Sequence, residues 1–168
     1  SPPSTGYRLL LQFVVEEGRH FIANSNFTAE EFAKEFPSVS GKITTAHLAP
    51  AMNARLLNWP QGRPTDSYIL CVGAIERRKG QLVLMEAYRR LTERRKGRLP
   101  KIFFIGPDRG DGEQLQRMIT AFDLVGQAGW LRYVPERAIA GYFRSASYFV
   151  FPSTYEGFGI PLIEAMTA

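Results

Sequence analysis

From Tyr68 onward, apolar runs as long as a β-strand alternate with segments of helical periodicity. The predicted strands cover about 68–72, 101–105, 130–134 and 147–151, and the predicted helices cover about 80–96, 113–125, 136–145 and a last segment from Gly159. Strands that alternate with helices are typical of a parallel sheet covered by helices on both faces. The sequence therefore predicts an α/β fold for this part of the chain.

Residues 1–66 follow a different pattern. They predict a helix up to about residue 18, a strand over 20–23, a helix over 28–36 and a strand over 42–48. Thr28 and Glu31 have the spacing of a capping box, so we expect Thr28 to cap its helix. The residues that follow are rich in Pro, Gly, Asn and Gln, a composition that is typical of linkers.

The two patterns divide the chain into three parts. We expect 1–49 to be the C-terminal part of one domain, 50–66 to be an interdomain linker, and 67–168 to be an incomplete second domain. A sheet covered on both faces needs another strand after the last predicted helix, and none follows it. We therefore expect the sequence to be a piece of a longer protein that is cut at both ends.

Composition and single residues narrow the class further. Apolar residues make up 45% and charged residues 22% of the 168 positions, as in soluble globular proteins. We expect a cytoplasmic protein, because neither a membrane-length apolar run nor a signal peptide is visible. The single cysteine, Cys71, lies in an apolar strand and is expected to be buried. His20 and His47 are far apart, and no metal-ligand spacing is present, so no metal site is predicted.

The formal net charge of +5 raises the question of an anionic partner. Much of the excess lies in Arg89-Arg90 and Arg94-Arg95-Lys96. Nucleic acid or an anionic membrane surface would be attracted to such a cluster. We favour a solvated helix end, because no nucleic-acid motif accompanies the cluster. No nucleic-acid partner is predicted, and peripheral contact with the inner face of the membrane is kept as an alternative.

Three loops follow predicted strands, and loops at the carboxyl ends of parallel strands are where such sheets bind ligands. Residues 73–80 form a basic turn, which could neutralise a diphosphate or simply cap the next helix. Residues 106–112 are Gly-rich, but their spacing fits neither the dinucleotide fingerprint nor the P-loop. We interpret this second loop as a surface turn.

The third loop carries the strongest functional signal. Glu156 and Glu164 lie eight positions apart across a turn with Gly157 and Gly159, and the turn opens a helix. A helix N-terminus after a strand binds anions well, because its backbone N–H groups are free and its dipole is positive there. Carboxylates beside a phosphate site are suited to accept hydrogen bonds from sugar hydroxyls.

Taken together, these segments resemble the retaining family-four glycosyltransferases of the GT-B fold, in which two Rossmann-like domains face each other across a cleft. Residues 151–166 look like the family signature, and 72–80 are similar to its donor phosphate loop. Residues 22–28 and 146–150 also fit, in the right order. One departure is Ala74, where the family often has arginine, and Arg78 is the candidate substitute. The resemblance implies a Rossmann-like donor-binding domain over 67–168 and the end of the acceptor-side domain over 1–49.

The resemblance also implies roles for individual residues. Glu156 would contact donor-sugar hydroxyls, while Arg78 and Lys79 would stabilise charge on the leaving diphosphate. Glu164 would bind the ribose hydroxyls. The remaining substrate-binding candidates are Gly73 in the first loop, Tyr133 and Val134 beside the base, and Gly157, Phe158, Gly159, Ile160 and Leu162 around the sugar and phosphate.

The implied reaction moves a hexose, such as mannose or glucose, from a UDP-, GDP- or ADP-sugar to a glycan or lipid-linked acceptor with retention. It would belong to bacterial polysaccharide biosynthesis, with neither a metal nor another cofactor. The isolated piece is expected to bind nucleotide weakly and not to turn over. The alternatives are a non-catalytic nucleotide-sugar-binding module and another sugar-nucleotide enzyme, such as an epimerase or a phosphorylase-like protein.

Overall fold

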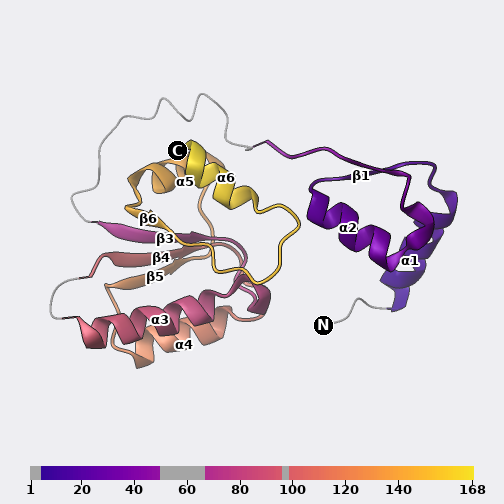
Figure 1. Cartoon of the computed structure of the whole chain (residues 1–168). Coiled ribbons are helices and arrows are strands. Elements are labelled where there is room, and N and C mark those ends of the chain that lie inside the picture. The colour runs from indigo at the N-terminus through magenta and orange to yellow at the C-terminus, as the bar shows by residue number, and fades with distance from the viewer. Residues whose placement is uncertain (1–4, 50–66, 96–98) are drawn as a thin grey trace. The chain divides into compact units, whose positions relative to one another are not determined.

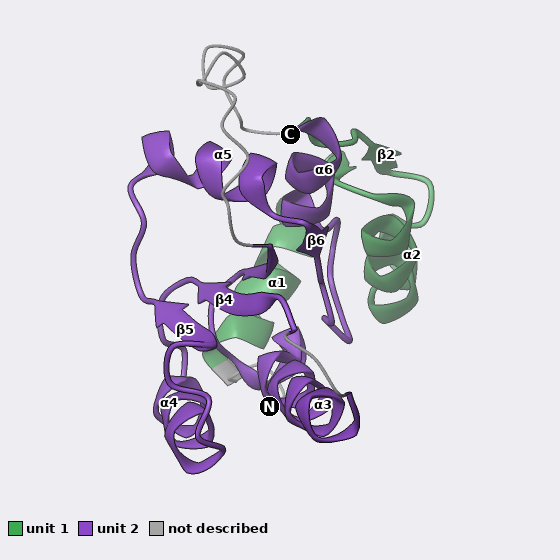
Figure 2. Cartoon of the chain, turned by 90° about the vertical axis from the view of Figure 1, so that its left-hand side faces the viewer, with its two compact units in different colours: residues 1–49 green, residues 50–168 purple. Residues whose placement is uncertain are grey.

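The computed structural model describes residues 5–49, 67–95 and 99–168. The chain divides into two compact units, residues 1–49 and 50–168 (Figure 2). The predicted linker, 50–66, lies outside the described residues. So does the last residue of the helix predicted over about 80–96.

The first unit contains two helices and a short parallel pair of strands. Its elements are α1 (Thr5–Glu17), β1 (Phe21–Ala23), α2 (Asn26–Glu35), the 3-10 turn η1 (Pro37–Val39) and β2 (Ile43–Thr45). β1 and β2 pair in register from Phe21 with Ile43 to Ala23 with Thr45. Phe32 of α2 packs its ring edge-on against Phe21, with 5.3 Å between the ring centres. Each predicted element of this unit is present, with shorter strands.

The predicted cap of α2 was wrong. Ser25, and not Thr28, is the N-cap, and its hydroxyl accepts a hydrogen bond from the backbone N–H of Thr28 at 3.0 Å. Ser25 has the extended backbone of a capping residue, with φ −156° and ψ 161°. Serine caps a helix as well as threonine does, and with Ser25 in this role the helix begins at Asn26.

The second unit is a four-stranded parallel sheet with helices on both faces (Figure 1). Its strands are β3 (Tyr68–Val72), β4 (Lys101–Ile105), β5 (Ala128–Leu131) and β6 (Tyr148–Phe149), in the order β5-β4-β3-β6. Its helices are the 3-10 turn η3 (Arg77–Lys79), α3 (Gln81–Arg94), α4 (Gly112–Ala121), α5 (Glu136–Ser145) and α6 (Ile160–Thr167). The predicted α/β fold is confirmed. α3 and α4 cover one face, and α5 and α6 cover the other.

Each face of the sheet has its own hydrophobic core, because successive strand residues point to opposite sides. Cys71 and Phe104 pack with Met85 and Leu115 under α3 and α4. Leu70, on the opposite face, packs with Ala140 and Phe143 of α5. Cys71 is only 2% exposed, as predicted, and burial raises the pKa of its thiol to about 12, although the nearby charge of Lys79 acts in the opposite direction.

The third strand of this sheet lies earlier than predicted, at 128–131 instead of 130–134. Its pairing with β4 runs from Ala128 opposite Ile102 to Leu131 opposite Ile105, where β4 ends. Ala and Gly are weak strand formers, so propensity moved the prediction toward the aromatic residues that follow. As a result, Tyr133 and Val134 belong to the loop after β5.

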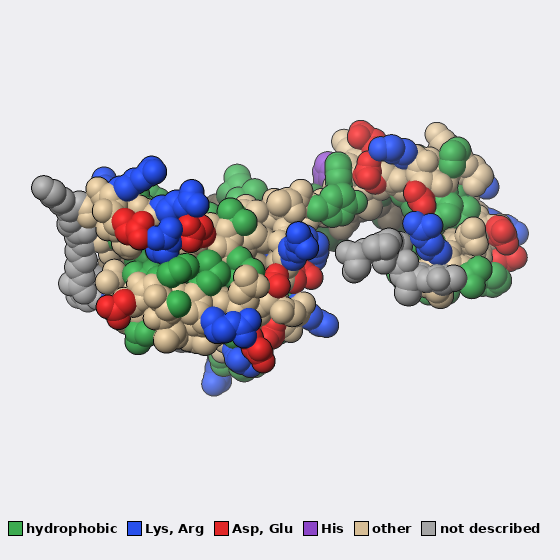
Figure 3. All heavy atoms as spheres, turned by 90° about the horizontal axis from the view of Figure 1, so that it is seen from below, with side chains coloured by type: hydrophobic (Ala, Val, Ile, Leu, Met, Phe, Trp, Pro, Cys, Tyr) green, Lys and Arg blue, Asp and Glu red, His purple; other side chains and the backbone are tan. Residues whose placement is uncertain are grey.

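The first two arginines of the basic cluster, Arg89 and Arg90, pair with acids on the same helix. Glu86 accepts hydrogen bonds from Arg89 and from Arg90, each at 2.8 Å, and Arg89 also pairs with Glu93. The view from below shows blue and red side chains lying side by side (Figure 3). This helix surface therefore presents both signs of charge. In the part of the chain that the structure describes, no helix has the length and apolar character needed to cross a membrane.

Candidate functional site

The candidate site lies at the edge of the second unit's sheet where the carboxyl ends of β3, β4 and β6 meet. Two loops are tied together there by the backbone. Gly73, directly after β3, donates its N–H to the carbonyl of Ile105 at 2.9 Å, and Ile75 donates to Pro107 at 2.8 Å. The loop after β3 is therefore held firmly against the loop after β4.

Two glycines allow the loops to approach closely. Gly106 has φ +150°, and a Cβ built there would lie 2.2 Å from the carbonyl oxygen of Gly73. Gly80 has φ +71°, and a Cβ there would lie 2.4 Å from the carbonyl oxygen of Pro152. A side chain at either position would need a positive φ and would overlap backbone. The approach at Gly106 joins the loops after β3 and β4, and the approach at Gly80 brings the loop after β6 onto the start of α3.

The loop after β4 uses its backbone N–H groups internally. The Asp108 carboxylate accepts hydrogen bonds from the N–H groups of Gly110 and Gly112, at 2.8 and 2.9 Å. These two bonds are the main reason that the pKa of Asp108 lies below its usual range. Two of the N–H groups that the glycines offer are therefore engaged by the protein's own carboxylate, which fits the interpretation of this loop as a surface turn.

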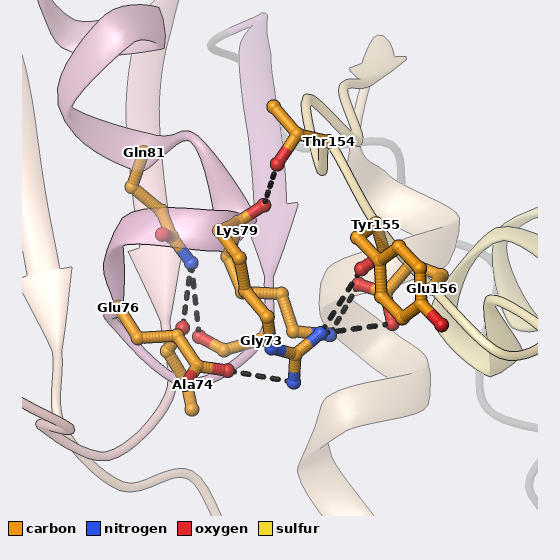
Figure 4. A network of polar contacts seen from close by, with 9 residues as sticks. Gly73, Ala74, Glu76, Lys79, Gln81, Thr154, Tyr155 and Glu156 are labelled. Carbon is orange, nitrogen blue, oxygen red and sulfur yellow. Dashed lines mark hydrogen bonds and ion pairs between the residues drawn. The ribbon is translucent and has the colours of Figure 1, made fainter. Parts of the chain in front are cut away.

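The loops after β3 and β6 meet in a network of charged side chains (Figure 4). Lys79 donates a hydrogen bond from Nζ to Oε1 of Glu156. Arg78 lies 2.8 Å from Oε1 of Glu76 and 3.4 Å from Oε2 of Glu156. Its Nη1 also donates to the carbonyl of Tyr155 at 3.1 Å. The structure thus brings together all three residues predicted to be catalytic.

The backbone fixes the position of this network. η3 presents Arg78 and Lys79, and the carbonyl of Arg78 accepts hydrogen bonds from Thr154, at 2.8 Å from its backbone N–H and 3.1 Å from its hydroxyl. Lys79 Nζ also lies 5.6 Å from the centre of the Phe151 ring. Contacts with the loop after β6 therefore hold both cations in place within the protein itself.

The members of the network differ in exposure. The side chain of Lys79 is 13% exposed and that of Glu156 is 21% exposed, whereas that of Arg78 is 46% exposed. Burial alone would raise the pKa of Glu156. The hydrogen bond from Lys79 and the charges of both cations act the other way, so the pKa lies below its usual range. Glu156 is therefore a carboxylate at neutral pH, held by two positive charges.

Sequence reasoning missed one polar residue of this region, Gln81. It is 2% exposed at the start of α3, and its Nε2 donates to the carbonyl of Ala74 at 2.8 Å and lies 3.5 Å from that of Gly73. Its Oε1 is buried and has no hydrogen-bond partner among the described residues. The available signal was a glutamine on the helix face that should carry apolar side chains. Gln81 holds the backbone of the loop that departs from the family pattern at Ala74.

Replacing Gln81 with leucine is expected to lower the free energy of unfolding by about 1–2 kcal/mol, because the Ala74 carbonyl would lose its donor in a buried place. Urea unfolding followed by circular dichroism measures the change. The matched control is Gln116→Leu, on the exposed side of α4, which is expected to stay within about 0.5 kcal/mol of the wild type. Equal stability of the two variants would show that the Gln81 bond does not hold the loop.

The Gly-rich turn leads directly into α6. Gly159 is buried and left-handed, with φ +83°, and it is the N-cap of a helix that begins at Ile160 with Pro161 in its first turn. No described side chain caps this helix. Gly157 and Phe158 are half-buried before it, and Leu162 is 46% exposed in its first turn. This arrangement leaves the helix N-terminus three residues from Glu156.

The other predicted residues lie outside the charged network. Glu164 is half-buried in α6, and burial, with a smaller contribution from the charge of Glu136 in α5, raises its pKa. Tyr133 is 80% exposed in the loop after β5, while Val134 is half-buried and packs against the core under α5. The ion pairs of Arg78 and Lys79 reach neither Glu164 nor this loop.

The chain is similar to several known proteins. O-antigen chain mannosyltransferase B from Escherichia coli is 29% identical, over 91% of this chain and 42% of its own length. In structure, the chain is similar to TarM from S. aureus, with a TM-score of 0.73 and 17% identity over 93% of this chain and 30% of that one. It is also similar to Anabaena HepE in complex with UDP and glucose, with a TM-score of 0.71 and 18% identity over 96% of this chain and 45% of that one.

This chain spans less than half the length of these relatives. The structural matches confirm the fold, a Rossmann-like sheet of the GT-B type. Residues 57–168, which include every member of the charged network, match the family described as glycosyl transferases group 1. The sequence match thus covers more than half of the chain, and the chain belongs to the glycosyl transferases group 1 family.

Proposed function

We propose that residues 67–168 are the donor-binding part of a glycosyltransferase that takes a sugar from a nucleoside-diphosphate sugar, with retention and without a metal. One observation carries the proposal: Arg78 and Lys79 meet Glu156 close to the N-terminus of α6, which no side chain of the described residues caps. Two cations and a helix N-terminus are suited to a diphosphate, and a carboxylate is suited to sugar hydroxyls.

In this proposal, the chemistry is stabilisation of a leaving group. Negative charge develops on the diphosphate as the bond to the sugar breaks, and fixed cations in a partly buried site stabilise such charge without reorganising. Lys79 is the better-placed cation, because its side chain is mostly buried and bonded at Nζ. Arg78 adds a second positive charge, and Glu156 accepts hydrogen bonds from the sugar.

The remaining candidates complete the donor site. Glu164 binds the ribose hydroxyls, Tyr133 and Val134 line the place of the base, and Gly73 allows a ligand to approach the loop after β3. A carboxyl with a raised pKa, such as that of Glu164, can still accept a hydrogen bond from a hydroxyl group.

The wider activity is proposed for a longer protein, because this chain spans less than half of its relatives. We propose a hexosyltransferase of bacterial polysaccharide biosynthesis with a glycan or lipid-linked acceptor, located in the cytoplasm or at the inner face of the membrane. The mannosyltransferase named among the relatives supports a hexose, and the HepE complex with UDP and glucose supports a nucleotide-sugar donor. The chain alone is proposed to bind nucleotide without transferring sugar.

Calorimetric titration of this chain with UDP, GDP and ADP tests the proposal. We expect one nucleotide to bind, Glu164→Ala to weaken it, and EDTA to leave the affinity unchanged. Arg94→Met, at the exposed end of α3, removes one positive charge elsewhere and is the control. Failure of all three nucleotides to bind would contradict the donor-site assignment. Loss of binding in EDTA would contradict metal independence alone.

A further inference from the structure

Glu156 engages the same two cations that the proposed function assigns to the donor diphosphate. Its Oε1 accepts a hydrogen bond from Lys79 (Figure 4). Its Oε2 lies 3.4 Å from Nη1 of Arg78. Carboxylates and phosphates bind lysine and arginine through the same charge-assisted hydrogen bonds. Glu156 and a diphosphate therefore compete for the same donors.

A free nucleoside diphosphate has to overcome this competition. It either separates Glu156 from Lys79 and Arg78 or lies beside the carboxylate as a second anion, and like charges a few ångströms apart repel each other. The Glu156 side chain is only 21% exposed, so water replaces its lost partners incompletely. The ion pairs thus oppose binding of a diphosphate that carries no sugar.

A sugar attached to the diphosphate changes the balance. Its hydroxyl groups donate hydrogen bonds, and an ionised carboxylate is purely an acceptor. The carboxylate released from the cations then has new partners, supplied by the ligand itself. Hydrogen bonds from the sugar offset the free energy of separating Glu156 from its cations when the donor binds. The diphosphate product that remains after sugar transfer has no sugar and forms no such bonds.

We propose that Glu156 makes the site discriminate between a nucleoside-diphosphate sugar and the free nucleoside diphosphate, by competing with the diphosphate for Lys79 and Arg78 until sugar hydroxyls engage it. This inference rests on the proposed function and deepens it. The discrimination favours release of the diphosphate product and limits inhibition by that product.

The test compares the affinities of each nucleoside diphosphate and its sugar in Glu156→Gln, which keeps the side-chain shape and removes the charge. UDP, GDP and ADP are titrated alongside UDP-glucose, GDP-mannose and ADP-glucose by calorimetry. We expect the variant to bind the free diphosphate about tenfold more tightly, and the sugar-bearing form less than about threefold more tightly. Glu156→Asp, which keeps the charge, is expected to retain more of the wild-type preference than the glutamine variant.

Glu76→Gln is the matched control, because it removes the same charge from the same turn and Glu76 pairs with Arg78 at 2.8 Å. Glu76→Gln is expected to change the affinities for the free diphosphate and for the nucleotide sugar by the same factor, so that the ratio of the two affinities stays unchanged. If Glu156→Gln binds the diphosphate more weakly, or if its affinities for both ligands shift equally, this inference is overturned. The proposed function still stands in that case, provided that the wild-type chain binds a nucleotide. A wild-type chain that binds no nucleotide would overturn the proposed function, and this inference with it.

Discussion

Replacing Lys79 with methionine is expected to weaken binding of the nucleoside diphosphate about thirtyfold, which corresponds to roughly 2 kcal/mol. Methionine keeps the length of the side chain and its packing near Phe151, and it removes the ammonium group. The effect is large because the Lys79 side chain is only 13% exposed, so neither water nor salt screens its charge fully. Calorimetric titration of the variant with the nucleotide that the wild type binds gives the change directly.

Arg78→Met and Arg94→Met separate a site effect from a general loss of charge. Arg78 is 46% exposed, so its replacement is expected to weaken binding about three- to tenfold, and replacement of exposed Arg94 is expected to change affinity less than twofold. Thermal unfolding of each variant checks that the fold is retained. Equal affinities for Lys79→Met and Arg94→Met would place the diphosphate elsewhere.

The double variant Lys79→Met, Glu156→Gln links this prediction to the competition inferred for Glu156. If the carboxylate opposes diphosphate binding mainly by engaging Lys79, the gain from Glu156→Gln should shrink when Lys79 is already absent. Two independent residues would instead give additive changes. The coupling between the substitutions therefore measures the competition without relying on either single variant.

The sheet of the second unit could be predicted because its signal is local. Apolar runs of strand length alternate with helical periodicity, and this alternation is enough to indicate parallel strands with helices on both faces. The errors arose where tertiary contacts outweigh local preference. β5 begins at Ala128 because β4 offers a partner there, and Ser25 caps α2 because its backbone is extended after β1.

The site was predictable as a set of residue types and not as a set of contacts. The basic and Gly-rich turns after strands indicated candidate loops, and the family resemblance then implied roles for Arg78, Lys79 and Glu156. The hydrogen bond between Lys79 and Glu156, however, joins residues 77 positions apart. Nothing in the sequence says that the carboxylate binds the cations. Gln81 was missed for a related reason: a glutamine on an apolar helix face is unusual, but its contacts are with backbone carbonyls, which the sequence does not identify.

Replacing Gly106 with alanine is expected to lower the free energy of unfolding by at least about 3 kcal/mol. The backbone has φ +150°, which alanine rarely adopts, and the new Cβ would lie 2.2 Å from the carbonyl oxygen of Gly73. Relief of that overlap requires the loops after β3 and β4 to separate, which would break the bond from Gly73 to Ile105. Urea unfolding followed by circular dichroism measures the loss.

Two other glycines make this prediction specific. Gly73 shares the unusual backbone, with φ +149°, but a Cβ there meets nothing closer than 3.9 Å, so Gly73→Ala is expected to cost about 1–2 kcal/mol. Gly141, within α5, has open space around its Cβ, and Gly141→Ala is expected to stabilise the chain by about 0.5–1 kcal/mol. The three expected changes differ because Gly106→Ala combines backbone strain with overlap, Gly73→Ala has strain alone, and Gly141→Ala has neither. If Gly106→Ala is as stable as Gly73→Ala, the loops after β3 and β4 can separate at little cost. The hydrogen bonds between these loops would then hold them less firmly than the structure indicates.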